Sequence, residues 1–226
     1  MAPVSFKGVF PIVITPFDDK ENIDLESFDR IIRFMGSIGA DGVTIVGVLG
    51  ESNRLTDKER EALTQTAVAA SDGLPIIVGT SHPGTRATCD LSQMAEALGA
   101  AGVMVTPSRE AVPNPERIFE YFQRIAKAIS IPVVAQDHPG STEVHMALPL
   151  VLRLLDEIPQ IACIKQEATP TPPKTRALIA QMPTGRATIL TGLGALYGQY
   201  DLESGADGFM TGFAFPEVLQ ALVHVR

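Results

Sequence analysis

The chain has 226 residues, of which 45% are hydrophobic, enough for one sizeable core, and no change in composition marks a second domain. A net charge of -8 argues against nucleic acid or an anionic membrane surface as a partner, because both favour a basic protein face. Its two cysteines, Cys89 and Cys163, lie far apart, and the chain has neither a signal-peptide pattern nor an apolar run long enough to cross a bilayer. We therefore expect a single domain over residues 1–226, with a small-molecule partner, no metal site and a cytoplasmic location.

Short β-branched runs recur along the chain and predict eight strands. They cover residues 8–15, 42–48, 76–79, 102–106, 133–135, 161–165, 187–191 and 208–211. Most are separated by segments with the apolar spacing of helices, such as residues 25–38 and 115–128, and Thr56 with Glu59 predicts a capping box at the start of another helix. Strands this apolar favour a parallel sheet covered by helices. Eight repeats predict a closed (β/α)8 TIM barrel; the alternative, an open doubly wound sheet, normally has a glycine-rich phosphate loop after an early strand.

One predicted strand ends in a lysine, at the barrel edge where functional groups gather in this fold. Lys165 follows an apolar run over residues 161–164. A lysine amine becomes a nucleophile near neutral pH when burial lowers its pKa, and it then forms an imine with a carbonyl compound. The simpler alternative is a solvated lysine that begins a loop.

Motifs along nearly the whole chain resemble those of the dihydrodipicolinate synthase and N-acetylneuraminate lyase family. In chain order they are Gly-Val-x-Pro-x-x-x-Thr-Pro-Phe at residues 8–17, residues 47–51 followed by Leu55-Thr56-x-x-Glu59, Val78-Gly79-Thr80, Val105-Thr106-Pro107 and Ile164-Lys165. The resemblance implies a class I lyase or aldolase without a cofactor, in which a lysine forms a Schiff base with pyruvate or another 2-oxo acid. Lys165 matches that lysine by position.

The chain departs from the family at the motif that grips the substrate carboxylate. That motif, glycine-threonine-threonine-glycine-glutamate, corresponds to residues 47–51, where Val48 and Leu49 replace both hydroxyl residues. Backbone amides around Leu49 and Gly50 remain available to an anion. We expect the substrate to contact Val48, Leu49, Gly50, Gln136, Gly192 and Met210.

A second departure lies at the end of the fifth strand, where the family has a proton-relaying tyrosine. Here the sequence is Gln136-Asp137-His138, and glutamine cannot transfer a proton as a phenol does. We therefore expect Asp137 or His138 to act with Lys165 in catalysis, the alternative for each being a loop or cap role. Glu167 is expected on the barrel rim, either as an acid or base or, more simply, as a solvated charge.

Two functions remain open from the sequence. The protein is either a Schiff-base lyase, aldolase or dehydratase with an altered proton relay, or a non-catalytic or regulatory barrel that binds a 2-oxo acid. Dihydrodipicolinate synthase activity itself is disfavoured, since the threonines and tyrosine are missing and Ser141 lies near the family's arginine position. The amphipathic segment 216–226 predicts an eighth helix in which the chain ends, with the family's further helical extension shortened or absent. We also expect a homodimer or homotetramer.

Overall fold

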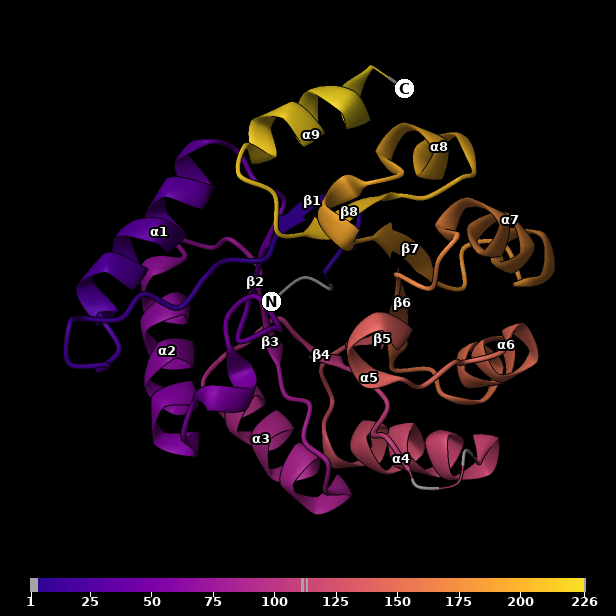
Figure 1. Ribbon diagram of the computed structural model, residues 1–226, viewed down its shortest axis with the longest axis horizontal. Coiled ribbons are helices and arrows are strands. Elements are labelled where there is room, and N and C mark those ends of the chain that lie inside the picture. Colours follow the sequence, from indigo (N-terminus) through magenta and orange to yellow (C-terminus); the bar gives the residue numbers. More distant parts are fainter. Residues whose placement is uncertain (1–3, 111, 113, 226) are drawn as a thin grey trace.

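Eight parallel strands form the centre of the molecule in the computed structural model, which describes residues 4–110, 112 and 114–225. The strands are β1 (Gly8–Pro11), β2 (Val43–Ile45), β3 (Ile76–Gly79), β4 (Gly102–Val105), β5 (Val133–Asp137), β6 (Ile161–Gln166), β7 (Thr188–Thr191) and β8 (Gly208–Thr211). They pair in the order β1-β8-β7-β6-β5-β4-β3-β2, and a bridge between Ile12 and Thr44 joins β1 to β2. The predicted (β/α)8 barrel is therefore confirmed (Figure 1).

Helices surround the strands in chain order, except the short α5, which lies over the end of β5 inside the ring, and α9 lies between α8 and α1 (Figure 1). They are α1 (Leu25–Ser37), α2 (Asp57–Ala70), α3 (Thr85–Ala97), α4 (Pro115–Ala128), α5 (Pro139–Thr142), α6 (Leu148–Glu157), α7 (Thr171–Gln181), α8 (Gly198–Glu203) and α9 (Pro216–His224), with 3-10 turns at Ser52–Arg54 and Leu193–Ala195. The predicted capping box is present, because Thr56 Oγ1 accepts from the Glu59 N–H at 3.3 Å while the Glu59 carboxylate accepts from the Thr56 N–H at 2.7 Å. The helix predicted over residues 216–226 ends earlier, and Arg226 lies outside the described residues.

Several strands differ in length from the prediction, and the larger differences fall at the C-terminal end of the barrel strands. β1 and β2 stop at Pro11 and Ile45, because the residues that follow form loops; Val46 already has a left-handed φ of 53°. β5 and β6 instead run further than predicted, to Asp137 and Gln166. The extension of these two strands brings polar residues into the sheet at its C-terminal edge.

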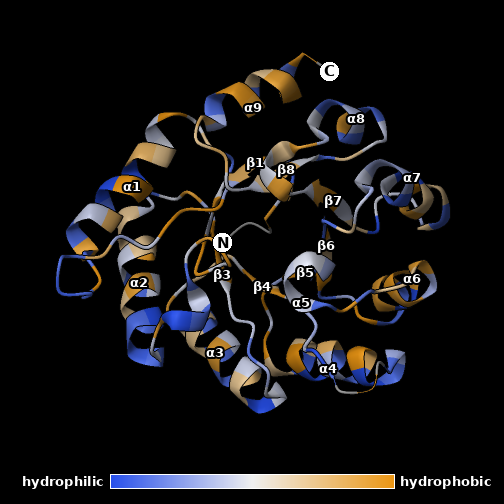
Figure 2. Ribbon diagram, in the orientation of Figure 1, coloured by the Kyte–Doolittle hydropathy of each residue, from blue (hydrophilic) through white to orange (hydrophobic). Residues whose placement is uncertain are grey.

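Two hydrophobic layers hold the barrel together. Inside it, apolar side chains from the strands form one cluster, which includes Phe10, Ile77, Met104, Val134, Cys163, Leu190 and Met210. A larger cluster fills the space between strands and helices, and most helices alternate between hydrophobic and hydrophilic residues, as expected for elements with one buried face (Figure 2). Among the described residues, no helix has the length and apolar character needed to cross a membrane.

Candidate active site

Lys165 lies inside the barrel because β6 contains an additional residue. The ladder between β5 and β6 shifts register between Val133 and Val134, and Ala162 is the unpaired residue of β6 at that point. After this bulge Cys163 packs inside the barrel, and Lys165, two residues further along the strand, faces the same way. Without the bulge the alternation of side chains would turn Lys165 toward the helices.

Lys165 and Glu167 form a buried ion pair at the C-terminal edge of the barrel. Their side chains are 3% and 5% exposed, and Lys165 Nζ lies 3.0 Å from Glu167 Oε2. Burial lowers the pKa of Lys165, although the charge of Glu167 opposes this effect. Burial would raise the pKa of Glu167, but Lys165, His138 and Gln136 together hold it below its ordinary value. The pair therefore combines an amine that loses its proton more readily than usual with a carboxylate that stays ionised.

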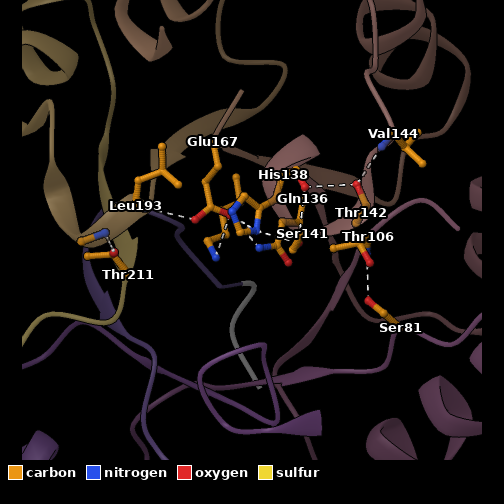
Figure 3. Close-up of polar contacts among 12 residues, drawn as sticks. Ser81, Thr106, Gln136, His138, Ser141, Thr142, Val144, Glu167, Leu193 and Thr211 are labelled. Carbon is orange, nitrogen blue, oxygen red and sulfur yellow. Dashed lines mark hydrogen bonds and ion pairs between the residues drawn. The ribbon is translucent and has the colours of Figure 1, made fainter. Parts of the chain in front are cut away.

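Glu167 is the centre of a small polar network (Figure 3). Gln136 Nε2 donates to Glu167 Oε2 at 2.6 Å, and the backbone N–H of Leu193 donates to Oε1 at 3.1 Å. His138 Nδ1 lies 3.9 Å from Oε2. The prediction of a solvated rim charge is wrong, because the two-residue spacing from Lys165 places Glu167 on the inner face of the barrel, where these groups enclose it.

The structure separates the two residues that we predicted as replacements for the family's tyrosine. His138 approaches Glu167 and also lies beside Ser141, with 2.8 Å between Nδ1 and Oγ. Asp137 is buried and accepts a hydrogen bond from Lys174 of α7. Because Gln136 faces the barrel interior, the next residue along β5 faces the helices. The structure thus brings His138 to the cluster and directs Asp137 away from it.

Three of the predicted substrate-contacting residues lie at or below this cluster. Gln136 belongs to it through the bond to Glu167. Gly192 lies directly against Glu167, since a Cβ at this position would lie 1.9 Å from Glu167 Oε1. Met210 is completely buried among the apolar side chains that fill the barrel.

The other three predicted contacts, Val48, Leu49 and Gly50, lie in the turn after β2. Val48 and Leu49 are 57% and 45% exposed, and Leu49 reaches the end of β8, where a Cβ on Gly212 would lie 2.4 Å from its Cδ2. The carbonyl of Gly50 accepts a hydrogen bond from Thr15 Oγ1 at 2.7 Å, which ties the turn to the segment after β1. Within the described part of the chain, no group accepts a hydrogen bond from the backbone N–H groups of Val48, Leu49 and Gly50.

A cavity of about 640 Å³ opens beside the cluster, with Gln136 in its wall. Most of its polar lining consists of hydroxyl and amide side chains, namely Ser52, Asn53, Ser81, Thr106, Ser108, Ser141 and Thr142. It also holds two arginines: Arg109 pairs with Glu143 at 2.8 Å, whereas Arg60 is 7% exposed and donates to the carbonyl of Ser52. Asp57 and Glu143 balance the charge of these arginines, so the lining suits a small molecule that carries hydroxyl groups. No group of three histidine, cysteine or acidic side chains that could hold a metal ion occurs in residues 4–110, 112 and 114–225.

Two parts of the cluster escaped the sequence prediction. Glu167 was named as a rim residue, but its burial was not predicted. Its spacing of two residues from Lys165 along a strand would have indicated that both side chains face the barrel interior. Leu193 carried no such signal, because it acts through its backbone N–H and any residue type supplies one.

Comparison with known proteins gives a consistent family match. The model of the dihydrodipicolinate synthetase family matches residues 5–215. L-2-keto-3-deoxyarabonate dehydratase from Azospirillum brasilense is 36% identical over 222 residues, which cover 96% of this chain and 71% of that protein. 4-Hydroxy-tetrahydrodipicolinate synthase from Bacillus subtilis is 31% identical over 181 residues, which cover 80% of this chain and 62% of that protein. The chain thus spans less than two thirds of the second relative's length.

Solved structures agree with the sequence matches. Dihydrodipicolinate synthase from Rhodopseudomonas palustris superposes with a TM-score of 0.91 at 33% identity, covering 100% of this chain and 76% of that one. YagE, a prophage protein of the dihydrodipicolinic acid synthase family from Escherichia coli K12, was solved in complex with pyruvate. It superposes with a TM-score of 0.89 at 27% identity, and the match covers 97% of this chain and 75% of that one.

Proposed function

The chain belongs to the dihydrodipicolinate synthetase family, and within that family we propose that it is a Schiff-base lyase that acts on a 2-oxo acid through Lys165. The observation that carries the proposal is the buried pair of Lys165 and Glu167, with 3.0 Å between Nζ and Oε2 at the functional edge of the barrel. The pyruvate complex of the E. coli relative supports the class of substrate.

The first step follows from the lowered pKa of Lys165. The neutral amine attacks the C2 carbonyl carbon of the 2-oxo acid, and the hydroxyl group of the resulting carbinolamine takes up a proton from solvent and leaves as water, which gives an iminium ion between Nζ and C2. The positive iminium withdraws electrons and makes the hydrogens on C3 acidic. The free N–H groups of Leu49 and Gly50 are the proposed donors to the substrate carboxylate, replacing the two missing hydroxyl groups.

Glu167 is the proposed base for the next step. Its carboxylate is ionised and lies beside the atom that carries the iminium, so it is placed to remove a proton from C3. In this proposal Glu167 takes the role that was predicted for Asp137 or His138. His138 is the proposed route by which this proton leaves, since its ring lies between Glu167 and Ser141.

We further propose dehydration as the overall reaction. After C3 loses its proton, its electrons form a double bond to C4 while the C4–O bond breaks, and the departing hydroxide takes up a proton to leave as water. The hydroxyl-lined cavity fits a substrate with hydroxyl groups beyond C3, and the Azospirillum dehydratase aligns with 96% of the chain. Hydrolysis of the imine then releases the 2-oxo product and restores the amine.

Reductive trapping tests the Schiff base directly. The protein is incubated with pyruvate or a 3-deoxy-2-oxo sugar acid, reduced with borohydride, and analysed by intact mass. We expect one adduct on the wild-type protein and none on Lys165→Met, a variant of similar side-chain volume. Binding of a 2-oxo acid by calorimetry without any adduct would instead support the non-catalytic barrel, and an adduct without turnover of any hydroxylated 2-oxo acid would overturn the dehydration step.

A further inference from the structure

We propose that the turn after β7, residues 192–195, positions the Glu167 carboxylate, with Gly192 and Thr211 as positioning residues. The inference rests on the proposed function only for what Glu167 does. The position of the Glu167 carboxylate does not depend on that function, because it follows from the contacts of this turn.

The first contact is steric. A Cβ on Gly192 would lie 1.9 Å from Oε1, 2.4 Å from Cδ and 2.7 Å from Cγ of Glu167. These three atoms form the end of the side chain, so the space that a larger residue would fill at position 192 is occupied by the carboxylate itself. Any side chain at this position must push Glu167 away.

The second contact is a backbone hydrogen bond made possible by an unusual conformation. Leu193 and Ala195 have φ of 54° and 59°, in the left-handed region that side-chain-bearing residues rarely adopt. In this conformation the Leu193 N–H donates to Glu167 Oε1 at 3.1 Å. Oε2 accepts a hydrogen bond from Gln136 and faces Lys165. Each carboxylate oxygen therefore has its own partners, and the group is fixed in orientation.

The third contact holds the turn in place from the next strand. The N–H of Gly194 donates to Thr211 Oγ1 at 2.7 Å, and Thr211 is buried at the end of β8 (Figure 3). The turn also closes on itself, because the Ala195 N–H donates to the carbonyl of Gly192 at 3.0 Å. Thr211 therefore acts on Glu167 through the turn, without touching it.

The consequence is measurable at Lys165, because the charge of Glu167 opposes the lowering of the lysine pKa. The other titratable groups that influence the pair are Cys163, next inward on β6, and His138 at the start of α5. The substitutions below alter neither of them. A change that moves Glu167 away from Nζ should therefore lower the pKa of Lys165 further.

The experiment is competitive labelling of Lys165 with acetic anhydride across a pH range, read by peptide mass spectrometry without any 2-oxo acid. We expect the labelling midpoint of Gly192→Ala to shift to lower pH, in the same direction as that of Glu167→Gln. Gly36→Ala is the matched control, because Gly36 lies in α1 with no atom closer than 4.0 Å to an added Cβ, and it should keep the wild-type midpoint. A folded Gly192→Ala protein with the wild-type midpoint would overturn the proposal.

Thr211 provides a second variant if Gly192→Ala fails to fold. Thr211→Val keeps the shape but removes the acceptor for Gly194, so its midpoint should also move to lower pH, whereas Thr211→Ser should retain the wild-type value. No shift in Thr211→Val would count against the proposal. Because labelling requires no substrate, shifted midpoints in a protein that forms no 2-oxo acid adduct would preserve this inference while defeating the proposed function.

Discussion

At the scale of single residues, the pair of Lys165 and Glu167 sets two requirements against each other. Imine formation needs a neutral amine, which burial favours, whereas the neighbouring carboxylate favours the ammonium form. Proton removal by Glu167, as proposed, needs that same carboxylate close to the imine. In the proposed mechanism, the site therefore gives up part of the reactivity of its lysine and keeps a base beside it.

Glu167→Gln separates these two effects. The substitution removes the charge that raises the pKa of Lys165, so the pKa should fall and the neutral amine should be present at lower pH. We expect the pH profile of borohydride trapping with pyruvate to shift to lower pH, while turnover falls by about 10²-fold or more. Unchanged turnover with an unchanged trapping profile would show that Glu167 is not the base.

Asp137 lies one residue from the cluster but is expected to act on stability. Its buried carboxylate pairs with Lys174, and Asp137→Asn leaves that cation without its counter-charge. Breaking a pair of this kind should reduce the free energy of unfolding by about 2–4 kcal/mol, measured in urea. The trapping profile should stay at its wild-type pH, since Asp137 faces the helices. A shift of that profile as large as that of Glu167→Gln would assign Asp137 to the cluster.

At the scale of elements, the sequence predicts the repeat better than it predicts the loops. Eight strands, the helix Pro115–Ala128 and the capping box of α2 follow from local periodicity and were confirmed. The bulge at Ala162 could not be predicted, because an apolar residue within an apolar run has the same sequence pattern as a regular strand. The left-handed conformations at Val46 and Leu193 run against the preferences of their side chains and depend on tertiary contacts. Position by position, the site is therefore less predictable than the barrel.

If the cavity beside Gln136 holds the substrate, as proposed, the loops after β2 to β5 also set the size of that substrate. Their cavity of about 640 Å³ is far larger than pyruvate requires, and its hydroxyl and amide groups offer hydrogen bonds that pyruvate has no groups to use. We expect hydroxylated 3-deoxy-2-oxo acids to compete with pyruvate for trapping on Lys165, at concentrations about ten-fold or more below that of pyruvate. Asn53→Ala should reduce this advantage without affecting pyruvate trapping. Equal competition by 2-oxobutyrate, which lacks hydroxyl groups, would contradict this view of the cavity.

At the scale of the whole molecule, α9 leaves apolar side chains uncovered. Leu219 packs beside Val9 and Phe209, while Val218 on the same helix and Phe215 at its N-cap are 56% and 59% exposed. Exposed apolar side chains close together on one element are typical of surfaces that pack against another protein. We therefore retain the prediction of a homodimer or homotetramer.

Sedimentation velocity over a wide concentration range tests this assembly. The wild-type chain should sediment as a dimer or tetramer, and Val218→Asp should shift it toward the monomer, because a charge would be buried without a partner if α9 lies in the interface. Lys58→Asp, on the first turn of α2, is a matched control that also introduces an aspartate at an exposed helical position. A monomer at every concentration would refute association, whereas an oligomer equally insensitive to both substitutions would place the interface away from α9. If Val218→Asp is monomeric, trapping by this variant would show that the proposed catalytic cluster, which a single chain supplies from β5, β6 and the residues that follow β5, β6 and β7, works without a second subunit.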